Sequence, residues 1–319
     1  MKTWQRLSGI LKMISHDYTL GLAAIFFLII LFTFGRLTQT PKPAPLVLTE
    51  TAPSEYAKIS LTAKAVYVYD TTETRALFSK NEDAQLPLAS LTKVMMAVSA
   101  LSLLPENTVV TINPEFLKSE GDSGLYNDER WKLKDLLDLT LLGSSNDGAN
   151  SIAAVAGAMG QQDLPYDLEQ KQFVETMNKK ASELGLSQTY FLNPTGLDEN
   201  KSISGAYGSA RDVAHLFYYA IETYPKLFDV TRHQNRTFAS LSSLTHEVKN
   251  TNTFVNKIPS LIGSKTGFTN LAGGNLVIAF DAGPNRHIII SILGSTEEGR
   301  FEDAEKLVWA TLEYLEKNV

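Results

Sequence analysis

Residues 87–97 read PLASLTKVMMA and place one serine and one lysine, Ser90 and Lys93, inside a run that is otherwise almost wholly apolar. The apolar residues after the lysine predict a buried helix, because they lie nearly all round the helix instead of forming one stripe. Lys93 falls in the first turn, where the helix dipole and burial both disfavour a positive charge. The pattern therefore predicts a lysine whose neutral amine is favoured.

A neutral amine one helical turn from a hydroxyl can accept the hydroxyl proton, which turns a weak alcohol into a nucleophile without histidine. This reading makes Ser90 the nucleophile and Lys93 its base. The alternative is that Ser90 is only a helix N-cap. A capping box has Glu or Gln three residues after the cap, whereas this sequence has lysine there, so the catalytic interpretation is favoured.

Two further polar stretches follow along the chain. LLGSSNDGAN (141–150) contains Ser144 and Asn146 between two predicted helices. They either cap the second helix or supply a proton-relaying hydroxyl and a positioning amide. GSKTGFTNLAGG (263–274) is either an ordinary turn or surface strand, or a strand edge that binds a carboxylate through a lysine and a threonine while its glycine permits close approach.

Taken together and in this order, Ser90-Leu-Thr-Lys93, Ser144-Ser-Asn146 and Lys265-Thr-Gly267 resemble the three signature motifs of penicillin-recognising serine enzymes. Over about residues 60–319 the chain is similar to the low-molecular-mass D-alanyl-D-alanine carboxypeptidases. The stretches that follow the order and spacing of that family are ASLTKVMMA, SSNDGAN, FVETMNKKASELGL, FLNPTGLD, SARDVAHL and KTGFTNLAGGNLV.

The resemblance implies catalytic Ser90, Lys93, Ser144 and Asn146, and substrate-binding Lys265, Thr266, Gly267 and Phe268. It implies that the serine attacks the carbonyl between two D-alanines and forms an acyl-enzyme that water releases. The backbone amides of Ser90 and Phe268 would form the oxyanion hole. The implied partners are a peptidoglycan stem peptide ending in D-Ala-D-Ala and β-lactams as covalent inhibitors, with no cofactor.

Departures from the family leave other functions open. Thr251 stands where some members have an arginine that helps to bind the carboxylate, and the chain ends with a helix instead of a further β-domain. A D,D-endopeptidase would use the same catalytic residues. A serine β-lactamase is less favoured, because the Glu-x-x-Leu-Asn pattern of one class is absent and the nearest match is Glu183 to Ser187. A binding or sensor domain without activity is the other alternative.

Two other matched stretches have good structural explanations. FLNPTGLD (191–198) reads as a Pro-Thr-Gly turn, and Ser209 to Asp212 reads as an N-cap with an acid three residues later. We interpret both as structural.

Runs of β-branched and aromatic residues lie at both ends of the domain, with helical periods between them. Strands are predicted at residues 63–70, 75–81, 262–269, 274–281 and 287–294. Helices are predicted after Ser90, at residues 132–142 and 146–159, around residues 173–184 and at residues 304–315. This order predicts an α+β fold of the DD-peptidase/β-lactamase type, with an antiparallel sheet formed by the N- and C-terminal parts and flanked by helices.

The N-terminus predicts a membrane attachment. Residues 18–34 carry no charge and follow Lys2, Arg6 and Lys12, as in a signal anchor; a cleaved signal peptide is the alternative. The predicted organisation is a cytoplasmic N-terminus (1–17), a transmembrane anchor (18–34), a proline-rich tether (35–56) and a catalytic domain (57–319). The positive-inside rule then places the catalytic domain outside the bacterial cytoplasmic membrane.

Composition excludes other classes. The net charge of −6 has no basic block to offset it, so a nucleic-acid partner is not expected. The chain has no cysteine, and its five histidines are scattered, so no metal site is expected.

Overall fold

The computed structural model describes residues 53–118, 120–121, 123–159, 161 and 164–318. The predicted anchor, residues 18–34, lies outside them. Within the described ranges, no helix combines the length and the apolar character needed to cross a bilayer. At the end of the predicted tether, Ser54–Ala57 form helix α2, and the hydroxyl of buried Tyr56 donates to Thr311 at 2.9 Å.

The predicted helices and strands are present in the predicted order, and the structure adds short strands and a hairpin between residues 86 and 249. The helices are α2 (Ser54–Ala57), η1 (Ala89–Leu91), α3 (Thr92–Leu103), η2 (Phe116–Lys118), α4 (Leu133–Gly143), α5 (Asn146–Gly157), α6 (Tyr166–Glu183), α7 (Ala210–Thr223), η3 (Asp229–Arg232), η4 (Val255–Lys257) and α8 (Gly299–Asn318). The strands are β1 (Ala65–Asp70), β2 (Arg75–Lys80), β3 (Leu86–Pro87), β4 (Val109–Thr111), β5 (Arg130–Lys132), β6 (Tyr190–Phe191), β7 (Ala206–Gly208), β8 (Asn235–Ala239), β9 (Thr245–Lys249), β10 (Leu261–Thr269), β11 (Gly273–Asp281) and β12 (His287–Ser295).

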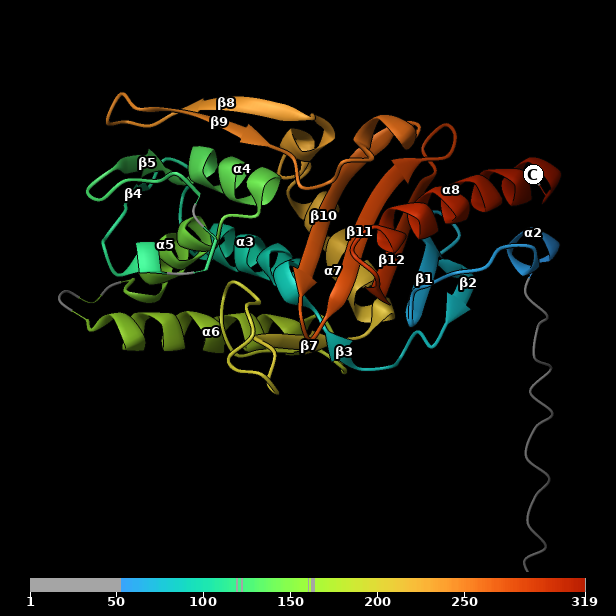
Figure 1. Ribbon diagram of the computed structural model, residues 1–319, viewed down its shortest axis with the longest axis horizontal. Helices are drawn as coiled ribbons and strands as arrows, with labels where there is room; N and C mark the ends of the chain where they lie inside the picture. Colours follow the sequence, from blue (N-terminus) through green and yellow to red (C-terminus); the bar gives the residue numbers. More distant parts are fainter. Residues whose placement is uncertain (1–52, 119, 122, 160, 162–163, 319) are drawn as a thin grey trace, which may run out of the picture. The chain divides into compact units, whose positions relative to one another are not determined.

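A five-stranded antiparallel sheet joins the two ends of the described chain (Figure 1). Its strand order is β10-β11-β12-β1-β2, so β1 pairs with β12, and Val66 lies opposite Ile292. Strand β10, which carries Lys265-Thr-Gly267, is an edge strand. The predicted antiparallel sheet built from both ends of the domain is therefore confirmed.

Helices cover both faces of this sheet, which explains why its central strand, β12, has buried apolar residues on both sides. Ile288, Ile290 and Ile292 of β12 pack in one hydrophobic cluster with residues of α8, whereas Ile289 and Leu293 pack in a second cluster that includes α7. Alternate side chains of a strand point to opposite faces, so the two clusters fill the two sides of the sheet. Helices α8 and α7 lie on these opposite faces (Figure 1).

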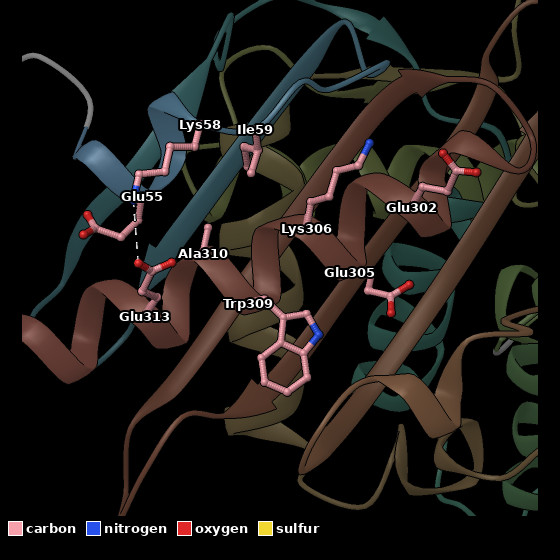
Figure 2. Close-up of a pocket in the computed structure, with 9 residues that line it drawn as sticks. All are labelled: Glu55, Lys58, Ile59, Glu302, Glu305, Lys306, Trp309, Ala310 and Glu313. Carbon is pink, nitrogen blue, oxygen red and sulfur yellow. Dashed lines mark ion pairs between the residues drawn. The ribbon is translucent and has the colours of Figure 1, made fainter.

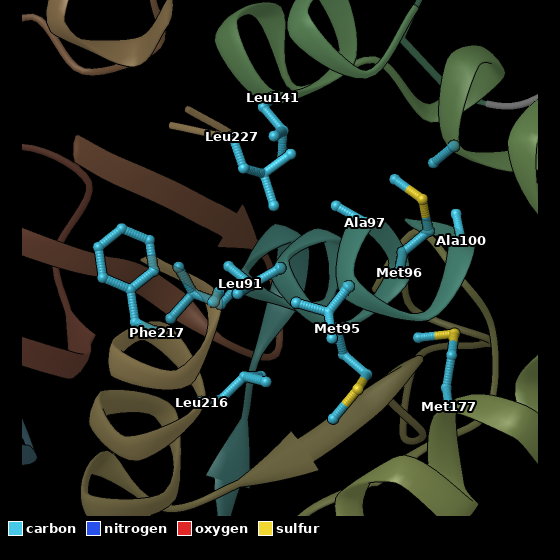
Figure 3. Close-up of a cluster of buried hydrophobic side chains, with 14 of the residues drawn as sticks. Leu91, Met95, Met96, Ala97, Ala100, Leu141, Met177, Leu216, Phe217 and Leu227 are labelled. Atoms are coloured by element: carbon cyan, nitrogen blue, oxygen red, sulfur yellow. The ribbon is translucent and has the colours of Figure 1, made fainter. Parts of the chain in front are cut away.

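Helix α3 runs through the larger cluster and is buried nearly all round, as its sequence predicts. Figure 3 shows Met95 and Met96 among side chains of the surrounding helices, including Met177 of α6 and Leu216 of α7. A helix enclosed in this way gives a polar side chain at its start little access to water. Lys93 is the second residue of α3 and is fully buried.

A groove of about 460 Å³ lies between α2 and α8 (Figure 2). Its lining includes Glu55, Lys58 and Trp309, whose indole is 55% exposed. None of the site residues predicted from the sequence lines this groove.

Candidate active site

Ser90 and Lys93 lie on the short helix η1 and the first turn of α3, and this junction brings their side chains together. The Lys93 Nζ lies 2.9 Å from the Ser90 Oγ. The helix N-cap position is Leu91, which makes no side-chain capping bond. Ser90 is therefore not the N-cap of α3, and its hydroxyl is left to pair with the amine.

The buried amine of Lys93 has two further polar neighbours. Its Nζ lies 2.7 Å from Asn146 Oδ1 and 2.9 Å from the carbonyl oxygen of Thr195. Both are pure acceptors, and a neutral amine has two N–H groups and one lone pair. Two donated bonds to these oxygens leave the lone pair for the Ser90 hydroxyl proton, which is the arrangement that a general base requires.

Burial lowers the pKa of the Lys93 amine from its usual value to about 7, and the nearby Asp147 carboxylate opposes part of that shift. Removing an ammonium group from water disfavours its charged form, and a neighbouring negative charge favours it. The prediction of a lysine that loses its proton near neutral pH is thus supported by the packing of α3.

The structure distinguishes between the helix-capping role and the catalytic role of Ser144 and Asn146. Ser145, not Ser144, is the N-cap of α5, since its Oγ accepts a 2.9 Å hydrogen bond from Gly148 N. Ser144 adopts a left-handed backbone conformation with φ 59°, and Asn146 turns its amide toward Lys93. The capping interpretation of Ser144 and Asn146 is therefore wrong, and both side chains face the site.

Lys265 brings the third motif to the same place. Its Nζ donates to Ser144 Oγ at 2.8 Å and to the Thr266 carbonyl at 2.9 Å. Burial, then the positive charges of Lys93 and Arg300, hold the pKa of the Lys265 amine well below its usual value. An arriving carboxylate would offset this cost and favour the ammonium form of Lys265.

The other residues of this strand complete the site. Thr266 Oγ1 lies 2.6 Å from Thr251 Oγ1, so Thr251 contributes a hydroxyl here. A Cβ on Gly267 would lie only 3.1 Å from Ser90 N, so its lack of a side chain permits the close approach expected from the sequence. Phe268 follows with its ring 46% exposed. The structure thus brings all eight predicted site residues to the junction of η1, α5 and β10.

The loop at residues 193–196 contributes a contact that the sequence interpretation missed. The predicted turn is present, because Asn193 Oδ1 accepts bonds from the backbone amides of Thr195 and Gly196. The same turn aims the Thr195 carbonyl at Lys93. Carbonyl direction depends on the folded loop, and the Asn-Pro-Thr-Gly turn signal was the only indication in the sequence. Ser209 is confirmed as an N-cap, since its Oγ accepts from Asp212 N at 3.1 Å.

A nucleophilic serine, a buried lysine base and a cationic strand edge define a serine hydrolase that works without histidine. The chain belongs to the D-alanyl-D-alanine carboxypeptidase family (Peptidase_S11), which it matches over residues 49–296. It is 30% identical to D-alanyl-D-alanine carboxypeptidase DacB2 of Mycobacterium tuberculosis over 241 residues, 74% of this chain and 77% of the relative. It is also 29% identical to a D-alanyl-D-alanine endopeptidase of Escherichia coli over 264 residues, 79% of this chain and 78% of the relative.

Solved structures agree with this family. Penicillin-binding protein D2 from Listeria monocytogenes, in its ampicillin-bound form, superposes with a TM-score of 0.67 and 26% identity. The match covers 79% of this chain and 98% of that one. The DD-peptidase fold predicted from the sequence motifs is therefore confirmed.

We predict that the Lys93 amine titrates with a midpoint of about 7. NMR of protein with ¹⁵N-labelled lysine would measure it, with Lys93→Met to assign the resonance. Asp147→Asn should move the midpoint lower, because the Asp147 carboxylate favours the ammonium form. A midpoint near the usual lysine value of 10.5 would exclude Lys93 as a base at neutral pH.

Proposed function

We propose that this chain is a serine-type D-Ala-D-Ala carboxypeptidase, which removes the terminal D-alanine from peptidoglycan stem peptides and is acylated by β-lactams. The observation that carries the proposal is the placement of Ser90 Oγ against the one face of the Lys93 amine that its acceptors leave open. Family membership and the carboxypeptidases among its relatives support the same activity.

In the first half of the reaction, Ser90 Oγ attacks the carbonyl between the two D-alanines, and Lys93 takes the hydroxyl proton. The backbone amides of Ser90 and Phe268 receive the oxyanion. Ser144 gives a proton to the leaving amine and regains one from Lys265, 2.8 Å away. D-alanine departs, and the remaining peptide is bound to Ser90 as an ester.

In the second half, water attacks the ester and passes a proton through Ser144 back to Lys265. Lys93 returns its proton to Ser90 as the ester breaks, so every group regains its starting state. The same two lysines thus serve both half-reactions, which need opposite proton transfers.

Recognition of the terminal carboxylate falls to Lys265 and Thr266. A buried cation and a hydroxyl bind a carboxylate through charge and a hydrogen bond. The short contact with Thr251 fixes the Thr266 hydroxyl, and this contact occupies the position where some family members have arginine. A carboxylate-binding strand edge favours substrates that end at the second D-alanine.

Two rival reactions use similar groups. A β-lactamase needs a group that activates the deacylating water, but Glu183 is the last residue of α6 and its carboxylate pairs with Lys180 at 2.7 Å. An endopeptidase is the stronger rival, because two relatives are named for that activity. It would cut cross-links, where a second stem peptide takes the place of the terminal D-alanine.

The test of the function combines two assays on the full chain. Wild type should be labelled by fluorescent penicillin and release D-alanine from a D-Ala-D-Ala pentapeptide, and Ser90→Ala should lose both, with a drop of at least about 10³-fold. The acylation rate should rise with pH through about 7, because Lys93 must be neutral to accept the proton. Ser209→Ala, which removes the N-cap of α7 but none of the proposed catalytic groups, should still be labelled.

Cross-linked muropeptides distinguish the two peptidase activities. Faster cleavage of the cross-link than of the free pentapeptide end would replace the carboxypeptidase assignment with endopeptidase. Equal labelling of wild type and Ser90→Ala would reject serine acylation altogether.

Thr251→Val should raise KM for the pentapeptide about fivefold and change kcat little. Loss of one hydroxyl partner from Thr266 costs about 1 kcal/mol in carboxylate binding. A pentapeptide with a C-terminal amide serves as the control substrate, because it lacks the carboxylate. An equal effect on both substrates would show that Thr251 does not act through carboxylate recognition.

From the sequence of residues 18–34 we also propose that the chain is anchored in the bacterial cytoplasmic membrane, with the domain from residue 57 on its outer side. The uncharged run and the preceding basic residues support this. The full chain should stay in the membrane fraction after an alkaline wash, and Leu28→Arg with Ile30→Arg should release it. Release of the unsubstituted chain would contradict the anchor.

A further inference from the structure

Arg300 is a buried cation at the first turn of α8, on the opposite side of the sheet from α7. Its side chain is 6% exposed, and among the described residues no carboxylate pairs with it within 4.0 Å. Its Nε also lacks a hydrogen-bond partner in the described part of the chain. A positive charge at a helix N-terminus, buried and near Lys265, is unfavourable on three counts, which the nearby carboxylates of Glu297 and Glu298 offset only in part. Such a residue calls for an explanation beyond stability.

The guanidinium makes one buried contact with the candidate active site. Arg300 Nη1 donates a 2.8 Å hydrogen bond to the carbonyl oxygen of Gly267. The ring of Phe301 lies 4.7 Å from the guanidinium carbon and holds it from the side. A charged donor makes this bond stronger than a bond between neutral groups.

The peptide unit whose carbonyl accepts this bond also carries an N–H group. The Gly267 carbonyl and the Phe268 N–H belong to one planar trans peptide, so they point in opposite directions. Fixing the oxygen therefore fixes the direction of the N–H. Gly267 itself lies against Ser90, since a Cβ there would be 3.1 Å from Ser90 N. A bond donated to the carbonyl also polarises the peptide and strengthens its N–H as a donor.

We propose that Arg300 is a positioning residue for the oxyanion hole: through the Gly267 carbonyl, it aligns and polarises the Phe268 N–H that receives the developing negative charge. The inference rests on the proposed function, because the Phe268 amide is an oxyanion donor only if Ser90 is acylated. Arg300 touches no substrate atom in this scheme. It acts on the Phe268 N–H through the peptide unit that joins Gly267 to Phe268.

The proposal predicts a loss in the acylation step and not in substrate binding. Arg300→Gln and Arg300→Lys should each lower the rate constant for acylation by a β-lactam about tenfold, less than the 10²-fold or more expected when an oxyanion donor is deleted outright. The dissociation constant of the non-covalent complex should stay unchanged. Affinity for a peptide boronic acid, which places a tetrahedral oxygen in the oxyanion hole, should fall by the same factor as acylation.

Infrared spectra of the acyl-enzyme give a readout that a purely structural role would not move. The ester carbonyl stretch should shift to higher frequency in both variants, because a weaker oxyanion hole polarises the carbonyl less. Arg286→Gln is the matched control, since Arg286 pairs with Asp70 at 2.6 Å elsewhere on the same sheet. It should lower the unfolding midpoint but leave acylation and the carbonyl frequency as in wild type.

Three outcomes would overturn the proposal. A lower unfolding midpoint with unchanged acylation and carbonyl frequency would make Arg300 purely structural. Wild-type behaviour of Arg300→Lys would assign the effect to charge alone. A carbonyl frequency unchanged in both variants would exclude the oxyanion hole as the route.

An NMR measurement distinguishes failure of the proposed function from failure of the positioning role of Arg300. The Phe268 amide proton shift of the free protein should move upfield in Arg300→Gln whether or not β-lactams react. A shift without any acylation of wild type would reject the carboxypeptidase proposal while keeping the contact between Arg300 and this peptide. An unchanged shift would reject the positioning role itself.

Discussion

The burial of Lys93 is the constraint on which the site depends. Helix α3 passes through the larger hydrophobic cluster, so its first turn is closed to water (Figure 3). Burial lowers the pKa of the amine to about 7. Asn146 and Thr195 then hold the amine with its remaining face toward Ser90. A base made in this way needs no histidine, but it needs a well-packed helical core around it.

Positive charge is concentrated where the substrate carboxylate would bind. Lys265 and Arg300 are both buried, and burial lowers the pKa of each. Each cation is therefore less stable than it would be in water, and the domain must offset that cost through its hydrophobic clusters. The carboxylate of an anionic substrate would relieve part of the repulsion between these positive charges. The same buried charges would thus favour substrate binding at the catalytic serine.

Local period in the sequence predicted the main sheet and the longer helices, and the resemblance of three short motifs to a known family implied the eight site residues. The position of Lys93 in an apolar helix was visible without any structure. The contacts of Thr195 and Arg300 could not be predicted from the sequence. The direction of a backbone carbonyl does not depend on residue type, and Arg300 and its partner Gly267 are 33 residues apart in the chain. What local patterns miss are the contacts that arise when distant segments pack.

Such packing also shapes the nucleophile itself. Ala89, directly before Ser90, has φ 49°, a left-handed conformation that costs an alanine about 1–2 kcal/mol. Two glycines from other segments leave room for this turn: a Cβ on Gly196 would lie 1.9 Å from the Ala89 carbonyl oxygen, and a Cβ on Gly267 would lie 3.2 Å from the Ala89 Cβ. Because three backbones meet here, the strained turn is held from both sides. Ser90 is therefore positioned by the tertiary fold, and the helix that follows it supplies only the lysine.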